Sequence, residues 1–333
     1  MITLKVCPST LADGFDTYSP AARKVLFDGK TVSHYLRVPS PSTNSKEAKE
    51  AMRNAKRISM SGAQPKYSVV IDKQESYLRY TQTDEQGTYI LKPSPSSYHI
   101  LNRDYCAANE HLTMQIAAQA YGIETAANGL CFFNNDEAAY LTRRFDVYDS
   151  GKYQQEDFAA LMGYTKANGG NDYKYCNGSY EECAEVIRNH VKAARIDLLH
   201  FFRLIVFNFI SLNDDAHLKN FSLINRKNEY RLSPAYDLIN TSLHLTDPRI
   251  FALEKGLFKE GMNLSDTHQV SRKDFEEFGR RIGLTDKLIK REIEEFIKEK
   301  PLVQELIDHS FLSEELKQQY KTTTGYRRKM LSF

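Results

Sequence analysis

Three oxygen-bearing side chains lie in and after a short polar segment that follows a long apolar stretch. Asp215 and Asn220 are five residues apart, and Asp237 follows in the segment Pro-Ala-Tyr-Asp-Leu. In protein kinases an Asp accepts the proton of the substrate hydroxyl, and an Asn five residues later binds magnesium together with a further Asp. Mg²⁺ needs few oxygen ligands from protein. The spacing therefore predicts phosphoryl transfer with Asp215 as base and Asn220 and Asp237 as metal ligands.

Basic side chains accompany this set. His217 and Lys219 closely follow Asp215, and both can donate hydrogen bonds to phosphate. Lys92 ends an expected strand and is the candidate for the lysine that contacts the α- and β-phosphates, with Glu110 on the next helix as its ion-pair partner. The alternative is that these are a solvated acidic turn and solvated surface charges. Their co-occurrence favours the catalytic interpretation.

Residues 59–66, Ser-Met-Ser-Gly-Ala-Gln-Pro-Lys, form a second candidate phosphate contact. The loop could offer backbone N–H groups and the Lys66 ammonium, although with one glycine it matches neither Gly-x-Gly-x-x-Gly nor a Walker A loop. Ser59 and Ser61 are candidate phosphorylation sites. Modification there would place about two negative charges where the phosphates of ATP should lie.

The elements that must position these groups change in character along the chain. Residues 1–45 predict an irregular arm and residues 45–58 a helix. Residues 67–145 hold short β-branched and aromatic segments around one helical pattern, which predicts the order β-β-β-α-β-β. The expected strands are 67–71, 77–80, 88–92, 130–133 and 138–143, and the expected helix is 109–121.

Helical patterns dominate after about residue 150. The expected helices are 179–190, 193–211 and the charged amphipathic region 271–333, and a hairpin of residues 220–224 and 229–232 interrupts them. We therefore predict an α+β, two-lobed, protein-kinase-like fold. Its β-rich N-terminal lobe is residues 1–145, with the serine-containing phosphate loop, and its mainly helical C-terminal lobe is residues 146–333, with the catalytic and metal-binding loops.

The composition is that of a soluble globular protein. The 333 residues are 41% hydrophobic and 26% charged, and a net charge of +2 gives no strong attraction to nucleic acid or membranes. Five scattered cysteines argue against a disulfide framework or a zinc site. The most apolar stretch, 201–210, is too short to span a membrane, and the N-terminus does not resemble a secretory signal. We expect a cytoplasmic protein.

Five short segments, taken in order, resemble the HipA family of bacterial toxin kinases over about residues 15–330. They are Ser-x-Ser-Gly-Ala-Gln-Pro-Lys at 59–66, Ile-Leu-Lys-Pro at 90–93, Arg-Arg-Phe-Asp at 143–146, Asp-x-His-x-Lys-Asn-Phe-Ser at 215–222 and Pro-Ala-Tyr-Asp at 234–237. The resemblance implies a HipA-like fold, ATP and Mg²⁺ as cofactors, and Arg143–Phe145 as the adenine hinge. The ATP-binding residues that it implies are Ser61, Gly62, Ala63, Gln64, Pro65, Lys66, Lys92, Arg143, Arg144, Phe145, His217, Leu218, Lys219 and Tyr236.

The same resemblance implies a biological role. Ser59 aligns with the autophosphorylated loop serine of the family, and Ser61 supplies a second acceptor. The chain lacks the small N-terminal domain of full HipA proteins and so resembles the short HipT form. This implies a separate HipS-like antitoxin, a HipB-like DNA-binding partner through which alone DNA is contacted, and an aminoacyl-tRNA synthetase substrate, tryptophanyl rather than glutamyl. Phosphorylation of that target would inhibit translation.

Two other functions remain open on the residues alone. Sugar and aminoalcohol kinases share the Asp-x-x-x-x-Asn spacing, so a small-molecule kinase on the same fold is the main alternative. A nucleotide-binding protein without catalysis is the other, and the intact set of Asp215, Asn220 and Asp237 argues against it.

Overall fold

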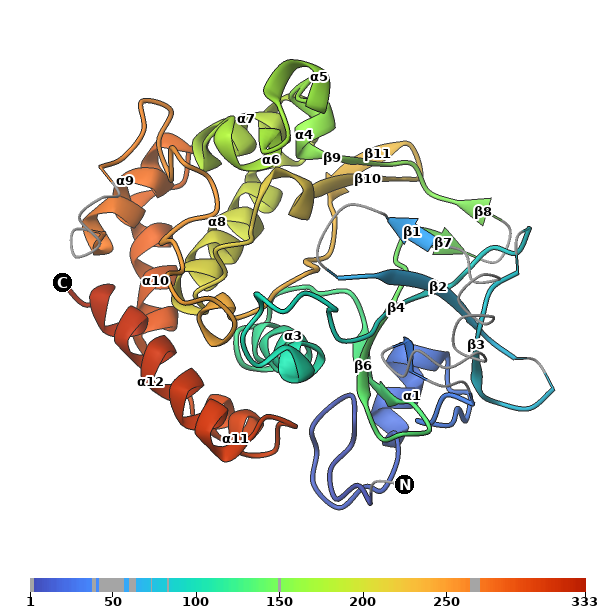
Figure 1. Cartoon of the computed structure of the whole chain (residues 1–333). Coiled ribbons are helices and arrows are strands. Elements are labelled where there is room, and N and C mark those ends of the chain that lie inside the picture. The colour runs from blue at the N-terminus through green and yellow to red at the C-terminus, as the bar shows by residue number, and fades with distance from the viewer. Residues whose placement is uncertain are drawn as a thin grey trace.

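An antiparallel sheet carries Lys66 and Lys92, two of the predicted phosphate contacts. The computed structural model describes residues 3–37, 40–41, 57–59, 64–72, 74–82, 84–148, 151–263 and 270–333. Within these residues the sheet has six strands in the order β1-β2-β4-β6-β5, and β3 pairs with the far end of β2 (Figure 1). The strands are β1 (Arg57–Ser59), β2 (Lys66–Ile71), β3 (Leu78–Tyr80), β4 (Tyr89–Lys92), β5 (Asn128–Phe132) and β6 (Ala138–Arg143).

The sheet is buried on both faces. Since successive strand residues point to opposite faces, Leu130 and Phe132 join the core shared with the helices, whereas Cys131 and Phe133 join a second core with the N-terminal segment. Helix α3 (Cys106–Gln115), continued by a π-helical turn (Ile116–Ala120), packs on β5 and β6. Figure 1 shows α3 between the sheet and the C-terminal helices.

The N-terminal segment is more ordered than the sequence predicted. We expected an irregular arm over residues 1–45, but helix α1 (Pro20–Phe27) forms within it. The Ser19 hydroxyl accepts a hydrogen bond from the N–H of Ala22 at 3.1 Å, and Pro20 occupies the first helical position. Ser-Pro is compatible with the turn of an irregular arm and equally with the start of a helix. Buried Leu26 and Phe27 then fix the helix on the sheet.

The predicted helix over residues 45–58 is wrong at its end. Arg57 and Ile58 lie in strand β1, which pairs antiparallel with β2 at Tyr67 and Lys66. Pairing with an existing strand outweighs local helix propensity there. The rest of that predicted helix lies outside the described residues.

The remainder of the chain is mainly helical. Helix α7 (Tyr180–His190) packs beside the long helix α8 (Ala194–Ile210), close to the predicted bounds. The predicted hairpin is β10 (Ser222–Arg226) and β11 (Glu229–Leu232), and β9 (Gln155–Asp157) extends it on the other edge. Shorter elements are 3₁₀ turns at Arg103–Tyr105, Leu218–Asn220 and Thr241–Leu243, strands β7 (Val147–Tyr148) and β8 (Gly151–Lys152), and helices α4 (Phe158–Leu161), α5 (Lys166–Gly169) and α6 (Tyr173–Cys176).

The charged C-terminal region divides into separate amphipathic helices. They are α9 (Arg272–Arg281), α10 (Asp286–Ile297), α11 (Pro301–Asp308) and α12 (Glu314–Met330). Local signals in the sequence determine where these helices begin. Ser271 forms a capping box with Asp274 at the start of α9, and Pro301 is the first residue of α11. At the start of α12 the Ser313 side chain accepts a hydrogen bond from the N–H of Leu316.

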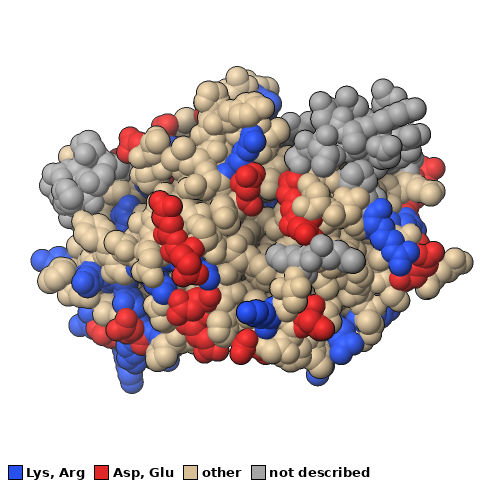
Figure 2. Space-filling view, turned by 60° about the horizontal axis from the view of Figure 1, so that its bottom comes forward, with Lys and Arg blue, Asp and Glu red and all other residues tan. Residues whose placement is uncertain are grey.

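The surface agrees with the nearly balanced charge. On the face drawn in Figure 2, acidic and basic side chains are interspersed. Among the described residues, no helix is both long and apolar enough to cross a membrane.

Candidate active site

The segment that carries Asp215 follows the buried helix α8 directly. The Asn213 amide donates to Oδ1 of Asn208 at 3.0 Å, and its own Oδ1 accepts from the N–H of Asp215 at 3.3 Å. Asp214 is buried, and its carboxylate accepts the backbone N–H of Arg249 at 2.8 Å. By contrast, the side chain of Asp215 is 48% exposed. Asp214 therefore serves as an anchor, and Asp215 is the carboxylate that a substrate can reach.

The two candidate metal ligands come from joined segments. The Asn220 Nδ2 donates to the carbonyl of Asp215 at 2.7 Å, so its side-chain oxygen is the end available to a cation. Next to Asp237, the Tyr236 hydroxyl donates to the carbonyl of Lys219 at 3.0 Å. This bond ties the segment of Asp237 to that of Asn220.

Ion pairs connect the sheet, helix α3 and the segment after β11; Lys92 and Glu110 are buried, whereas Lys66 and Asp237 are partly exposed. Lys92 Nζ lies 2.5 Å from Glu110 Oε1 and 2.5 Å from Asp237 Oδ1. Lys66 Nζ lies 2.9 Å from the other oxygen, Oδ2, of Asp237. The expected Lys92–Glu110 pair is therefore present, and Asp237 joins it. Buried charges persist in proteins when they are paired, and here two ammonium groups match two carboxylates.

The electrostatics of this cluster keep Asp237 ionised. Burial alone would raise the pKa of the Asp237 carboxyl, but Lys66 and Lys92 outweigh it and hold this pKa well below the usual value. Burial would lower the pKa of Lys92, but Asp237 and Glu110 raise it instead. Burial raises the pKa of Glu110, with Lys92 opposing. The backbone of Asp237 is left-handed, with φ at 56°, a conformation that ordinary side chains seldom adopt outside functional sites and turns.

The donor set fits Mg²⁺ held together with phosphates. An ionised carboxylate at Asp237 and an amide oxygen at Asn220 are hard ligands of the kind that Mg²⁺ prefers. No group of three or more His, Cys, Asp or Glu side chains in the described ranges could hold a metal ion by itself. A cation whose other ligands are phosphate oxygens and water does not need such a group.

His217 and Leu218 are buried within the segment that carries Asp215. The Lys174 ammonium lies 2.9 Å from Nε2 of His217, and no described residue bonds to the buried Nδ1. Burial lowers the pKa of His217 to about 4, and the positive charge of Lys174 acts in the same direction while Asp215 opposes it. His217 is therefore neutral near pH 7. Leu218 is fully buried as a whole residue, so the structure does not expose it to a nucleotide.

The predicted adenine hinge spans the end of β6 and the residues after it. The Arg143 guanidinium binds both carboxylate oxygens of Asp28 at 2.7 Å, at the C-terminal end of α1. Arg144 pairs with Asp146 at 2.7 Å. The rings of Phe145 and Tyr236 lie 5.8 Å apart. The structure therefore brings Phe145 to the site, whereas the charges of both arginines are engaged by neighbouring aspartates.

The predicted phosphate loop is described in part. Ser61, Gly62 and Ala63 lie outside the described residues, and of Ser59 only the backbone position at the end of β1 is described. The Gln64 amide donates to the carbonyl of Pro93 at 3.0 Å, next to Lys92. Together with the bond of Lys66 to Asp237, this places the end of the loop, including Pro65, at the ion pairs of Asp237. Lys219 is more peripheral, 40% exposed and 3.8 Å from Asp157.

Sequence reasoning missed two residues of helix α6 that contact the candidate base Asp215 and its neighbour His217. The Tyr175 hydroxyl donates to Oδ1 of Asp215, and its neighbour Lys174 contacts His217. About 40 residues separate the two contacting segments along the chain. No local spacing pattern predicts such a contact, because it arises from the packing of α6 on the 3₁₀ turn Leu218–Asn220.

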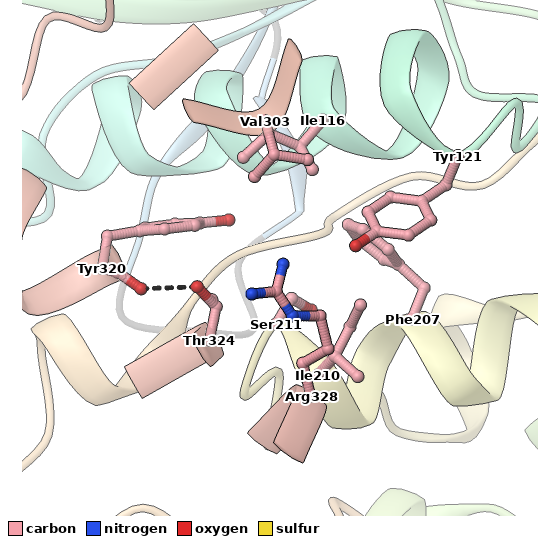
Figure 3. A pocket seen from close by; sticks show the side chains of 9 residues that line it. All are labelled: Ile116, Tyr121, Phe207, Ile210, Ser211, Val303, Tyr320, Thr324 and Arg328. Atoms are coloured by element: carbon pink, nitrogen blue, oxygen red, sulfur yellow. Dashed lines mark hydrogen bonds between the residues drawn. The ribbon is translucent and has the colours of Figure 1, made fainter. Parts of the chain in front are cut away.

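A small pocket lies apart from the predicted site residues. Figure 3 shows its lining from the π-helical turn, the end of α8 and the C-terminal helices. Its walls are Ile116, Tyr121, Phe207, Ile210, Ser211, Val303, Tyr320, Thr324 and Arg328. None of the predicted site residues lines it.

One protein family matches most of this chain, and two proteins of similar sequence are named as kinases. The sequence profile described as the HipA-like C-terminal domain matches residues 58–302. A Haemophilus influenzae protein, named as an inferred kinase, is 34% identical over 278 residues, which are 77% of this chain and 76% of that protein. The Sinorhizobium fredii protein Y4dM, also named as an inferred kinase, is 32% identical over 58% of this chain and 47% of its own length.

Solved structures share the fold. A Shewanella oneidensis HipA, from a toxin–antitoxin complex with HipB and operator DNA, has a TM-score of 0.64 at 19% identity over 83% of this chain and 65% of its own. The Helicobacter pylori proinflammatory kinase CtkA has a TM-score of 0.50 at 16% identity, over 80% of this chain and 90% of its own. These likenesses confirm the predicted α+β, two-lobed kinase-like fold. This chain spans less than two thirds of the Shewanella chain and about half of Y4dM.

Proposed function

This chain belongs to the family of HipA-like C-terminal domains, and on that premise we propose that it is an ATP- and Mg²⁺-dependent serine/threonine protein kinase. The observation that carries the proposal is the junction at Asp237. There Lys66 and Lys92 pair with the carboxylate of Asp237, which is of the kind that binds Mg²⁺. The hydrogen bond of Tyr236 to Lys219 connects Asp237 to the segment of Asp215 and Asn220. A phosphoryl-transfer site needs these groups together.

The residues divide the work by their charge. Asp215 orients the acceptor hydroxyl and receives its proton. Lys92, Lys66 and Lys219 attract the phosphate oxygens, and Asn220 and Asp237 would hold Mg²⁺. When bound, Mg²⁺ would neutralise negative charge on the phosphates. Glu110 keeps Lys92 in place through the buried pair. Catalysis on this arrangement comes from positioning and electrostatics.

The finer assignments rest on the resemblance of the motifs. We propose a toxin kinase of the HipT type in the cytoplasm, with tryptophanyl-tRNA synthetase as the protein substrate, HipS-like and HipB-like partners, and autophosphorylation at Ser59 or Ser61. The Shewanella HipA assembles with HipB and DNA, which motivates the partner proposal. We also propose lobes of 1–145 and 146–333. In the described chain the six-stranded sheet precedes residue 146, and Asp215, Asn220 and Asp237 follow it.

The acceptor class is the first test. The purified protein is incubated with Mg²⁺ and ATP labelled on the γ-phosphate, once with cell extract proteins and once with a metabolite fraction. Label in one protein band of synthetase size is the expected result. Label in a sugar or aminoalcohol would instead establish the small-molecule kinase, and nucleotide binding without any turnover would establish a non-catalytic binding protein.

A further inference from the structure

Tyr175 contacts the proposed catalytic carboxylate of Asp215, and neither the motifs nor the family resemblance assigns a role to it. Its hydroxyl donates to Oδ1 of Asp215. No described residue donates to Oδ2 of Asp215, although half of that side chain is buried. The backbone of Asp215 is fixed separately, because its carbonyl accepts from Asn220 and from the N–H of His217. The hydroxyl of Tyr175 is thus the group that sets the rotation of the carboxylate.

The ring of Tyr175 is held from several sides. The Arg249 guanidinium lies 4.9 Å from the ring centroid, and the His217 ring meets it edge-on at 4.9 Å. The Lys174 ammonium lies 4.8 Å from the same centroid, and the Tyr175 carbonyl accepts the N–H of Glu254 at 3.1 Å. A side chain packed in this way is preorganised. We therefore do not expect an incoming substrate to displace Tyr175 from Asp215.

The phenol also stays protonated. Burial raises the pKa of Tyr175, and the neighbouring Asp215 charge raises it further. At neutral pH the hydroxyl therefore donates its proton in the hydrogen bond to Asp215. Such a bond to an ionised carboxylate is stronger than a hydrogen bond between two neutral groups.

We propose that Tyr175 is a positioning residue for phosphoryl transfer: it holds Oδ1 of Asp215 so that Oδ2 accepts the hydrogen bond of the acceptor hydroxyl. This inference rests on the proposed function. In the step, the acceptor oxygen forms a bond to the γ-phosphorus, the bond from that phosphorus to the β,γ-bridging oxygen breaks, and ADP leaves. The proton of the acceptor hydroxyl passes to Oδ2 of Asp215.

Kinetics of Tyr175→Phe test the role. The variant keeps the ring and loses the hydroxyl, so we expect kcat to fall about tenfold, as for a lost hydrogen bond to a charged group. The affinity for Mg²⁺–ATP should stay within about twofold, because the phosphate-binding lysines are untouched. Tyr173→Phe is the matched control on the same helix, since no described residue bonds to its hydroxyl. An equal loss in the control, or a Tyr175→Phe variant as fast as or faster than wild type, would overturn the inference.

A double-mutant cycle tests the contact without any catalysis. The melting temperatures of wild type, Tyr175→Phe, Asp215→Ala and the double variant are compared. We expect Tyr175→Phe to lower the melting temperature less when Asp215 is already absent, and additive shifts would contradict the contact. A wild-type protein that transfers no phosphate, with a non-additive cycle, would overturn the proposed function and with it the role of Tyr175. Additive shifts in an active kinase would overturn the inference alone.

Discussion

The two halves of the candidate site, the ion pair of Lys92 with Glu110 and the carboxylate of Asp215, differ in how far their charges are buried. Lys92 and Glu110 are buried, with side chains 3% and 4% exposed, and each charge has a partner at 2.5 Å. Asp215 is 48% exposed and is held by hydrogen bonds to its backbone and by one phenol. The buried half can fix phosphates rigidly, while the open half must admit an acceptor. Substitutions in the first half should therefore cost much stability, whereas substitutions in the second half should cost turnover with only a small loss of stability.

The largest effect on stability is expected at Lys92. Lys92→Met leaves the buried carboxylate of Glu110 without its ammonium partner, whereas Asp237 keeps its pair with Lys66. Breaking a buried ion pair from one side costs about 3–5 kcal/mol. Urea unfolding followed by circular dichroism should show a loss of this size. A loss below about 1 kcal/mol, the range of surface pairs, would remove the distinction between the two halves.

His217 gives the next effect, through pH. Its pKa falls from the usual 6.5 to about 4 in the folded protein, mainly through burial. Between these values the unfolded chain binds a proton that the folded chain does not, so stability is full above pH 6.5 and declines as the pH falls toward 4. His217→Gln should reduce this decline by at most about 1.4 kcal/mol per pH unit. Unfolding curves across this range, with exposed His99→Gln as control, measure it. Equal slopes for the two variants would contradict the burial of His217 as its cause.

The smallest effect is expected at the exposed pair of Arg143 and Asp28. Their side chains are 34% and 60% exposed, and exposed pairs contribute up to about 1 kcal/mol. Arg143→Met should therefore cost about 0.5 kcal/mol in urea unfolding, because a bidentate but solvated pair is lost. ATP affinity should remain within about twofold, since the guanidinium is engaged by α1. A tenfold loss of ATP affinity would show that the Arg143 side chain itself contacts the nucleotide.

The contrast between the halves also explains what the sequence could predict. Asp215 and Asn220 lie in one local segment, and Lys92 and Glu110 lie on a strand and the helix that follows it, so spacing and element order sufficed for both pairs. The pairing of Lys66 with Asp237 joins residues 171 positions apart, and only the folded chain reveals it. Tyr175 belongs to a four-residue helix with no periodic pattern. Helix α1 was missed because Ser-Pro begins both turns and helices.

Asp215 offers the most direct measurement. Affinity for Mg²⁺–ATP and single-turnover phosphate transfer are compared for wild type, Asp215→Asn and Asp247→Asn, an exposed carboxylate for which the structure records no hydrogen bond or ion pair among the described residues. If Asp215 is the base, Asp215→Asn loses about 10²–10⁴-fold in transfer while ATP affinity stays within about twofold, and Asp247→Asn matches wild type. Transfer by Asp215→Asn at the wild-type rate would contradict its role as base.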